Sequence, residues 1–193
     1  LKETEERNAE LAVINSVQAA LAAELNIQGI YDTVGDKIRE IFHNSDLAIR
    51  VFDQKAKLEF FPYIYENGQR LYIPPQALIS QGISAHILHT HETLVINENM
   101  LEEVAKYGSY IIPGTQAEKS AVYVPLMVGD QARGLISLAD MQHEHAFSES
   151  DVRLLQTLVN SMSVALENAR LFQAEKIARQ QTESLYHVAR SLI

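Results

Sequence analysis

Hydrophobic positions recur with helical spacing near the amino end of the chain. Four large aliphatic residues there are separated by 3, 7 and 4 positions, and residues 1–25 contain no Gly or Pro. These residues are Leu11, Ile14, Leu21 and Leu25. Because this spacing places them on one stripe of a helix, the pattern predicts an amino-terminal helix. A second helix is predicted over residues 31–42, before a polar break at 43–46.

The carboxyl end is also free of Gly and Pro, from Glu149 to Ile193. A first apolar stripe with steps of 4, 3, 4 and 3 predicts a helix that lies on a sheet. It consists of Leu155, Val159, Met162, Leu166 and Ala169. A second stripe with alternating steps of 3 and 4 is a heptad seam, typical of a coiled coil. It consists of Leu171, Ala174, Ala178, Gln181, Leu185, Val188 and Leu192.

The middle of the chain has the short apolar runs of a β-sheet. Residues 47–52 and 58–65 flank a polar turn, and residues 120–128 and 134–140 flank the turn at Gly129-Asp130. Both pairs predict β-hairpins. Alternate positions of the 120–128 run are apolar in both parities, so this strand needs cover on both of its faces.

Residues 74–119 have a mixed pattern. A short helix is predicted near residues 84–89 and an apolar strand at 94–96, and the rest reads as irregular up to residue 119. Because a long irregular stretch inside a compact domain often covers a binding site, we expect a functional flap here.

Composition narrows the classes of function. The 193 residues are 47% hydrophobic, enough for one sizeable core. The net charge of −9 opposes binding to nucleic acid or to anionic membrane surfaces, and no apolar run approaches the roughly 18 to 20 residues of a membrane span. The absence of Cys excludes disulfides and thiol chemistry, and fits a reducing compartment such as the cytoplasm. Because the first residue is Leu, we expect a piece of a larger protein.

The hairpin at 120–140, followed by Phe147-Ser148-Glu149-Ser150-Asp151 and by the run 165–172, resembles the closing half of a GAF domain. Further matching points are the strand ending at Asp53, Gly82-Ile83 before a short helix, and the return from His91 to Asn97. The resemblance covers about residues 11–172. It implies an α+β fold of the PAS/GAF type, with a central antiparallel sheet, helices packed on one face and a ligand pocket under the loops of the other.

The resemblance also implies an organisation and a role. We expect a signalling helix at 1–25, a GAF body at 26–150, its last helix at 151–172 and a coiled-coil linker at 173–193. The long terminal helices would form a homodimeric bundle and connect to adjacent domains of the same chain. The implied role is that of a small-molecule sensor in a cytoplasmic two-component protein, such as a phytochrome-like histidine kinase or a related regulator. The alternative is a structural dimerisation and spacer module that binds nothing.

Missing residues exclude several activities found in the family. GAF domains that reduce free methionine sulfoxide depend on Cys, so the absence of Cys excludes this activity. Bilin-carrying relatives attach their pigment through Cys, so covalent pigment is excluded as well, whereas noncovalent binding is not. The Asn-Lys, Phe and Asp-Glu signature of cyclic-nucleotide-binding relatives has no convincing counterpart, which leaves cyclic nucleotides open but unsupported. We therefore expect a regulatory domain rather than an enzyme, with no catalytic residues and with a ligand or cofactor that the sequence does not name.

Seven residues are candidates for a ligand site. Arg50 is the one charged residue inside an apolar strand, so its guanidinium must reach water, a carboxylate or an anionic ligand. His86 and His89 share a helix face, but without Cys or matched carboxylates they predict pocket lining rather than a metal site. Aromatic rings and hydroxyl groups suited to a pocket complete the set. They are Tyr63, Tyr107, Tyr110 and Tyr123.

Overall fold

The computed structural model describes residues 2–43, 46–109 and 117–191. Its helices are α1 (Lys2–Ala22), α2 (Ile27–Ile41), α3 (Ile83–Thr90), α4 (Met100–Lys106) and α5 (Glu149–Ser191). Its strands are β1 (Asp46–Asp53), β2 (Leu58–Glu66), β3 (Gln69–Leu71), β4 (Gln76–Ala77), β5 (Leu94–Ile96), β6 (Ser120–Val128) and β7 (Gln131–Asp140). The α+β class and the two hairpins of the sequence analysis are confirmed. Helix α4 was missed, in the stretch predicted to be irregular.

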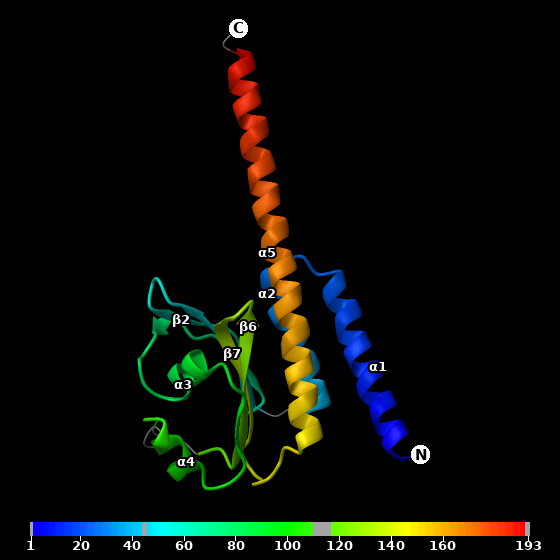
Figure 1. Cartoon of the computed structure of the whole chain (residues 1–193), viewed down its shortest axis with the longest axis vertical. Helices are drawn as coiled ribbons and strands as arrows, with labels where there is room; N and C mark the ends of the chain where they lie inside the picture. Colours follow the sequence, from blue (N-terminus) through cyan, green and yellow to red (C-terminus); the bar gives the residue numbers. More distant parts are fainter. Residues whose placement is uncertain (1, 44–45, 110–116, 192–193) are drawn as a thin grey trace.

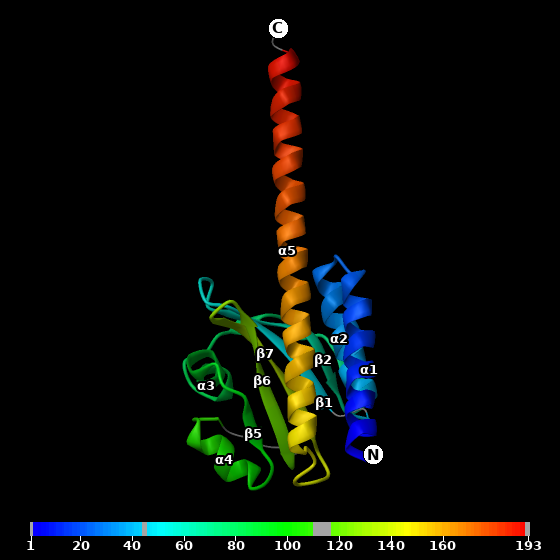
Figure 2. The same ribbon diagram turned by 45° about the vertical axis from the view of Figure 1, so that its right-hand side comes forward.

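The strands form one antiparallel sheet in the order β3-β2-β1-β7-β6-β5, with β4 paired to β2. Strand β7 lies between β1 and β6, so the hairpin β6–β7 joins the hairpin β1–β2 through the pairing of β7 with β1. The sheet separates α3 and α4 from α2, α5 and α1 in Figure 1, and Figure 2 shows the same layers after rotation. We call these two sides the α3 face and the α5 face of the sheet.

The α5 face carries the larger core. Ile49 of β1 lies opposite Ile136 of β7, and both side chains are fully buried there. The predicted stripe of α5 covers them, because all five of its members from Leu155 to Ala169 are buried. This confirms that the first half of α5 lies on the sheet. The interior on this side is made of apolar side chains, with the phenol ring of Tyr63 as its largest member.

The α3 face carries a smaller core under two short helices. Phe52, Leu135 and Tyr123 on the sheet pack against Ile87 of α3 and Val104 of α4. The expectation that helices pack on only one face is therefore wrong. The apolar residues of the 120–128 strand need cover on both sides, and on this side α3, which was predicted near residues 84–89, and α4, which was not predicted, supply it.

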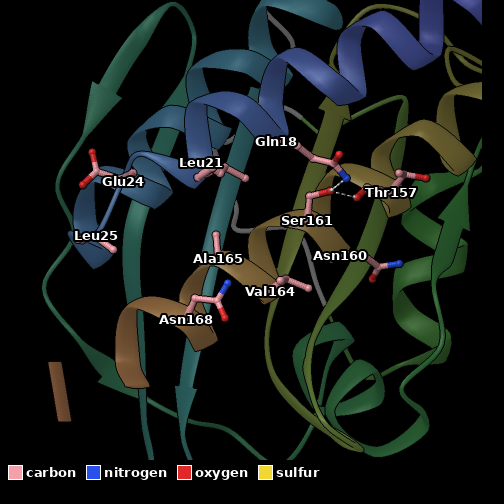
Figure 3. A pocket seen from close by; sticks show the side chains of 11 residues that line it. Gln18, Leu21, Glu24, Leu25, Thr157, Asn160, Ser161, Val164, Ala165 and Asn168 are labelled. Atoms are coloured by element: carbon pink, nitrogen blue, oxygen red, sulfur yellow. Dashed lines mark hydrogen bonds between the residues drawn. The ribbon is translucent and has the colours of Figure 1, made fainter. Parts of the chain in front are cut away.

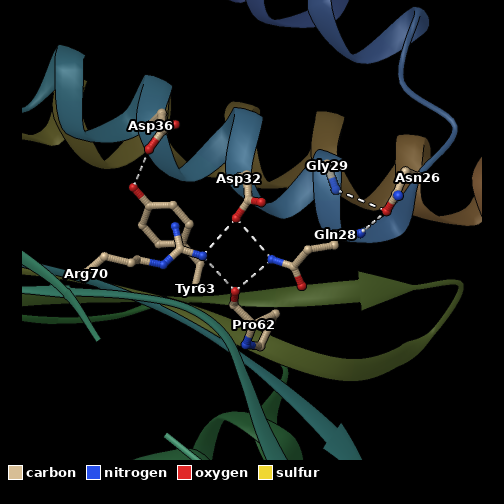
Figure 4. Close-up of polar contacts among 8 residues, drawn as sticks. All are labelled: Asn26, Gln28, Gly29, Asp32, Asp36, Pro62, Tyr63 and Arg70. Carbon is tan, nitrogen blue, oxygen red and sulfur yellow. Dashed lines mark hydrogen bonds and ion pairs between the residues drawn. The ribbon is translucent and has the colours of Figure 1, made fainter. Parts of the chain in front are cut away.

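Polar contacts fix α2 to the edge of the sheet (Figure 4). Asn26 caps α2 by accepting hydrogen bonds from two backbone N–H groups at the helix start. Asp32 accepts hydrogen bonds from Arg70 at 2.8 Å and from Gln28 at 3.0 Å. The guanidinium of Arg70 also lies 3.7 Å from the ring centroid of Tyr63. These contacts hold the first strands against the helix layer.

Helix α5 continues well beyond the body as a single rod (Figure 1). Large apolar side chains on this extension are 47–71% exposed in the single chain. They include Leu171, Phe172, Ile177, Leu185 and Tyr186. No helix in the described ranges combines the length and apolar character needed to cross a membrane.

Helix α1 packs on the body through a narrower set of residues than its predicted stripe. Leu21 is buried, as expected, but Leu11 and Leu25 are about half exposed. The second anchor is Val17, which is 1% exposed and lies one turn before Leu21. The helix was predicted to run to about residue 25, whereas α1 ends at Ala22, so Leu25 lies beyond it.

Candidate functional site

A polar cluster lies at the centre of the α3 face. Arg50 of β1 lies opposite Leu135 of β7, and this pairing directs its side chain toward α3 rather than toward α5. Its Nη1 donates to Ser84 Oγ at 3.3 Å and lies 3.7 Å from Glu59 Oε1. Ser84 Oγ in turn donates to Glu59 Oε1 at 3.2 Å. We call these three residues the Arg50 cluster.

The local backbone explains how a charged residue comes to occupy this position. The register of β1 against β2 shifts between Ile49 and Val51, so Arg50 lies at a β-bulge. On the facing strand this irregular segment includes Pro62, which has no N–H to donate to the ladder. The bulge leaves the guanidinium partly accessible, with 34% of the side chain exposed, whereas the side chain of Glu59 is 9% exposed.

Several acidic side chains lie around the guanidinium of Arg50 and influence one another's pKa. Burial raises the pKa of Glu66, the carboxylate of Asp46 raises it further, and Arg50 opposes the shift. Burial also raises the pKa of the Tyr123 hydroxyl, with Glu118 adding to the effect and Arg50 opposing it. The Nε of Arg50 is buried and has no hydrogen-bond partner among the described residues. This arrangement suits a small ligand that offers acceptors to Arg50 and donors or positive charge to the carboxylates.

Helices α3 and α4 are tied to each other above the sheet. The N–H of Gly82 donates to the carbonyl of Tyr107 at 2.8 Å, and the N–H of Ile83 donates to Ser109 Oγ at 3.0 Å. The rings of His86 and Tyr107 lie 4.5 Å apart between centroids. Gly82 has a φ of +90°, which favours glycine, and a Cβ there would lie 2.9 Å from Ser109 Oγ. The two helices thus form one cover over the α3 face.

Five of the seven predicted site residues lie in this half of the molecule. Arg50 and Tyr123 lie on the sheet, and His86 and Tyr107 meet in the cover. His89 is exposed on the outer side of α3 and does not approach the Arg50 cluster. Tyr110 lies outside the described residues.

Tyr63 does not share the site predicted for it. It lies opposite Ile49, so its side chain points to the α5 face, where it is fully buried against α2. Its hydroxyl donates to Asp36 Oδ1 at 2.7 Å, and its ring fills the space where a Cβ on Gly35 would lie. Its role is to pack α2 on the sheet. Tyr63 and Arg50 therefore lie on opposite faces of the sheet, which depends on a strand pairing that was not visible in the sequence.

The family model of the GAF domain matches residues 24–167 of this chain. The chain belongs to the GAF domain family. The match begins just after α1 and ends within α5. It therefore includes the whole sheet, α2, α3, α4 and the part of α5 up to residue 167.

Solved GAF structures have the same fold at low identity. The GAF domain of an Acinetobacter phosphoenolpyruvate-protein phosphotransferase is 16% identical, with a TM-score of 0.70, over 85% of this chain and 96% of that one. A segment of a methyl-accepting chemotaxis protein is 13% identical, with a TM-score of 0.69, over 82% and 99%. The free methionine-R-sulfoxide reductase of Neisseria meningitidis, solved with its substrate, is 16% identical, with a TM-score of 0.67, over 84% and 90%. These likenesses concern the fold.

Sequence reasoning missed two members of the Arg50 cluster in this GAF domain. Glu59 is a charged residue within the apolar run 58–65, so the argument applied to Arg50 would have identified it as well. Ser84 carries no such signal, because a serine near the start of a short helix is common for reasons of capping alone. Within the ranges described, no group of three or more His, Cys, Asp or Glu side chains is arranged to hold a metal ion.

A hollow of the GAF domain lies between α1 and α5 and has a volume of about 470 Å³ (Figure 3). Leu21, Leu25 and Val164 give it apolar walls, and Gln18 donates to Ser161 Oγ across it at 3.5 Å. None of the seven predicted site residues lines it. It lies at the base of the exposed half of α5, beside the surface predicted to form a dimer.

Proposed function

We propose that this GAF domain is a regulatory sensor module that binds a small polar molecule at the Arg50 cluster, and that it is not an enzyme. The observation that carries the proposal is the partly accessible guanidinium at the centre of the α3 face, with one buried nitrogen unpartnered. Its cover is made of two short helices, which can move more readily than the α5 layer. The lack of Cys in the chain supports a regulatory rather than a thiol-dependent catalytic role.

Strand β6 gives a physical route from this site to the long helix. Tyr123 points to the α3 face, and its neighbours Val122 and Val124 pack in the core under α5. A ligand that displaces Tyr123 or Arg50 would therefore change the packing beneath Leu158 and Val159 of α5. Binding that differs between two packings of α5 would shift the equilibrium between them.

We further propose that two copies pair through their terminal helices. The described side chains of the heptad seam, from Leu171 to Leu185, are exposed in the single chain, and the hollow between α1 and α5 lies at the base of the seam. Two such seams packed together would cover the exposed leucines. In this arrangement the domain belongs to a cytoplasmic sensor histidine kinase or related regulator, and the paired helices carry the signal to the adjacent domain.

Spin labelling tests the sensor proposal directly. Because the chain has no Cys, Glu175→Cys provides a single label on the exposed half of α5. Distances between paired labels are measured by pulsed electron resonance during titration with amino acids, nucleotides and haem. We expect a tightly bound ligand to change the distance distribution in the parent protein and not in Arg50→Gln. Arg133→Gln, an exposed arginine on β7, is the matched control.

The spacer module remains the second candidate, and one observation favours it. Ser84 and Glu59 already lie next to Nη1 of Arg50, so this nitrogen has partners without a ligand. Native mass spectrometry of freshly purified protein and an absorption spectrum separate the two. No retained mass, no colour, and no ligand from the panel that raises the melting temperature would support the spacer and count against the sensor.

A further inference from the structure

Another hollow lies on the outer side of α3 and shares no residue with the Arg50 cluster. Its volume of about 660 Å³ is within the range typical of small-molecule sites. Four segments form its walls: the turn after β1, the segment after β4, the carboxyl-terminal part of α3 with His91, and the start of β7. Leu78, Ile79 and Leu88 supply apolar surface. We call this the outer hollow.

The one formal charge in the lining of the outer hollow is positive, whereas the protein as a whole is acidic. Lys57, His89 and His91 line the hollow, and no Asp or Glu does, although the chain has a net charge of −9. Over the described ranges, these three side chains make no hydrogen bond or ion pair with another side chain. The nearby carboxylate of Asp53 is used within its own turn, where it accepts hydrogen bonds from two backbone N–H groups. The hollow is thus lined by one cationic side chain, that of Lys57, and by two imidazoles that can donate N–H groups, and none of the three has an anionic partner among the described residues.

The backbone does not explain why a lysine stands at position 57. Lys57 has a φ of +53°, in the left-handed region that favours Gly or Asn. His91, which ends α3 with a φ of +61°, is of a residue type that this region also accepts. The lysine side chain costs backbone strain that Gly would avoid. This points to a use for the lysine side chain itself.

The two sides of α3 therefore face different parts of the molecule. Ser84 and Ile87 face the sheet, whereas Ala85, Leu88 and His89 face the outer hollow. We propose that the outer hollow is a second binding site, for a small molecule that carries a carboxylate or phosphate group on an apolar body. Lys57 and the two histidines hold the anionic group, and the leucines pack against the apolar part. This site is independent of the function proposed for the Arg50 cluster.

The test uses benzoate and phenyl phosphate as anionic probes and benzamide as a neutral one, with binding followed by amide NMR. We expect saturable shifts at Lys57, His89 and His91 with at least one anionic probe, and none with benzamide. Lys57→Gln should weaken binding at least threefold, and Lys57→Gln with His91→Asn at least tenfold. Lys55→Gln, in the same turn but outside the lining, should bind as the parent does.

Melting temperatures separate binding from a structural role. Lys57→Gly and His91→Gly should lose affinity for the probe while their melting temperatures stay equal or rise, because Gly removes strain. Lower melting temperatures with unchanged affinity would overturn the proposal, since the residues would then act only in the fold. Equal binding of benzamide, no saturation at millimolar concentration, or shifts centred on Arg50 and Ser84 would overturn it as well. None of these results bears on the label distances expected for the sensor.

Discussion

The sheet buries two cores of different kinds, one against α2 and α5 and the other against α3 and α4. On the α5 face, Ile49, Ile136 and Leu158 are fully buried among apolar neighbours. On the α3 face, buried Glu59 and Ser84 lie beside Arg50 within a smaller apolar cluster. A permanent interface gains most from dry packing, whereas buried polar groups cost free energy unless each finds a partner. The difference indicates which face supports the fold and which keeps chemistry available.

Truncating the α5 face should produce the largest loss of stability. Leu158→Ala removes a fully buried side chain from the centre of the larger core, and we expect the free energy of unfolding to fall by about 2–5 kcal/mol. Val164→Ala lies on the same helix but is 62% exposed, so its cost should stay within about 0.5 kcal/mol. Urea unfolding followed by circular dichroism measures both. Equal losses would mean that α5 is not anchored as described.

A substitution on the α3 face should behave differently, because a second substitution can recover the free energy of unfolding that the first one loses. Glu59→Leu removes the carboxylate near Arg50, and we expect a loss of about 1–3 kcal/mol from the charge left without its partner. Adding Arg50→Met should recover most of that loss, since a paired replacement by apolar groups is often neutral. A double-mutant cycle in urea measures the coupling. Additive losses would show that the pair contributes nothing.

A partly buried phenol at the edge of the α5 core, that of Tyr31, gives the next effect. Burial raises the pKa of Tyr31 to about 12, against 10.0 for the free side chain. Between these values the unfolded chain loses the proton and the folded chain keeps it, so stability falls as the pH rises from about 10 to 12. At pH 11 the difference amounts to about 1.4 kcal/mol.

Tyr31→Phe tests this dependence, because it should remove that part of the alkaline loss. Urea unfolding at pH 8 and pH 11 measures it, and Tyr186→Phe, which removes an exposed phenol from α5, is the control. If the parent and Tyr31→Phe lose stability equally between the two pH values, Tyr31 is not buried in the folded protein.

The sequence predicted the α5 face better than the α3 face for a physical reason. A helix that lies on a sheet leaves a long periodic record, and the stripe from Leu155 to Ala169 was read correctly. A cover made of two short helices leaves almost none, so α4 was missed. Arg50 was found because one charge in an apolar strand is conspicuous, whereas its partner Ser84 comes from a segment 34 residues away. The bulge beside Arg50 depends on how two strands pair, which no single segment encodes.

The smallest effect on folding should come from the half of α5 that lies on neither face. Leu185 is 71% exposed, so Leu185→Glu should change the free energy of unfolding of the body by less than about 0.5 kcal/mol. If the predicted seam pairs two chains, the same substitution should weaken self-association in sedimentation experiments, because it places a charge in an apolar contact. Tyr186→Glu changes the neighbouring exposed residue outside the seam and should weaken it less. A parent protein that sediments as a monomer would show that the seam does not pair two chains. The contrast between the two cores would be unaffected, because it is tested by urea unfolding of the Leu158 and Glu59 variants.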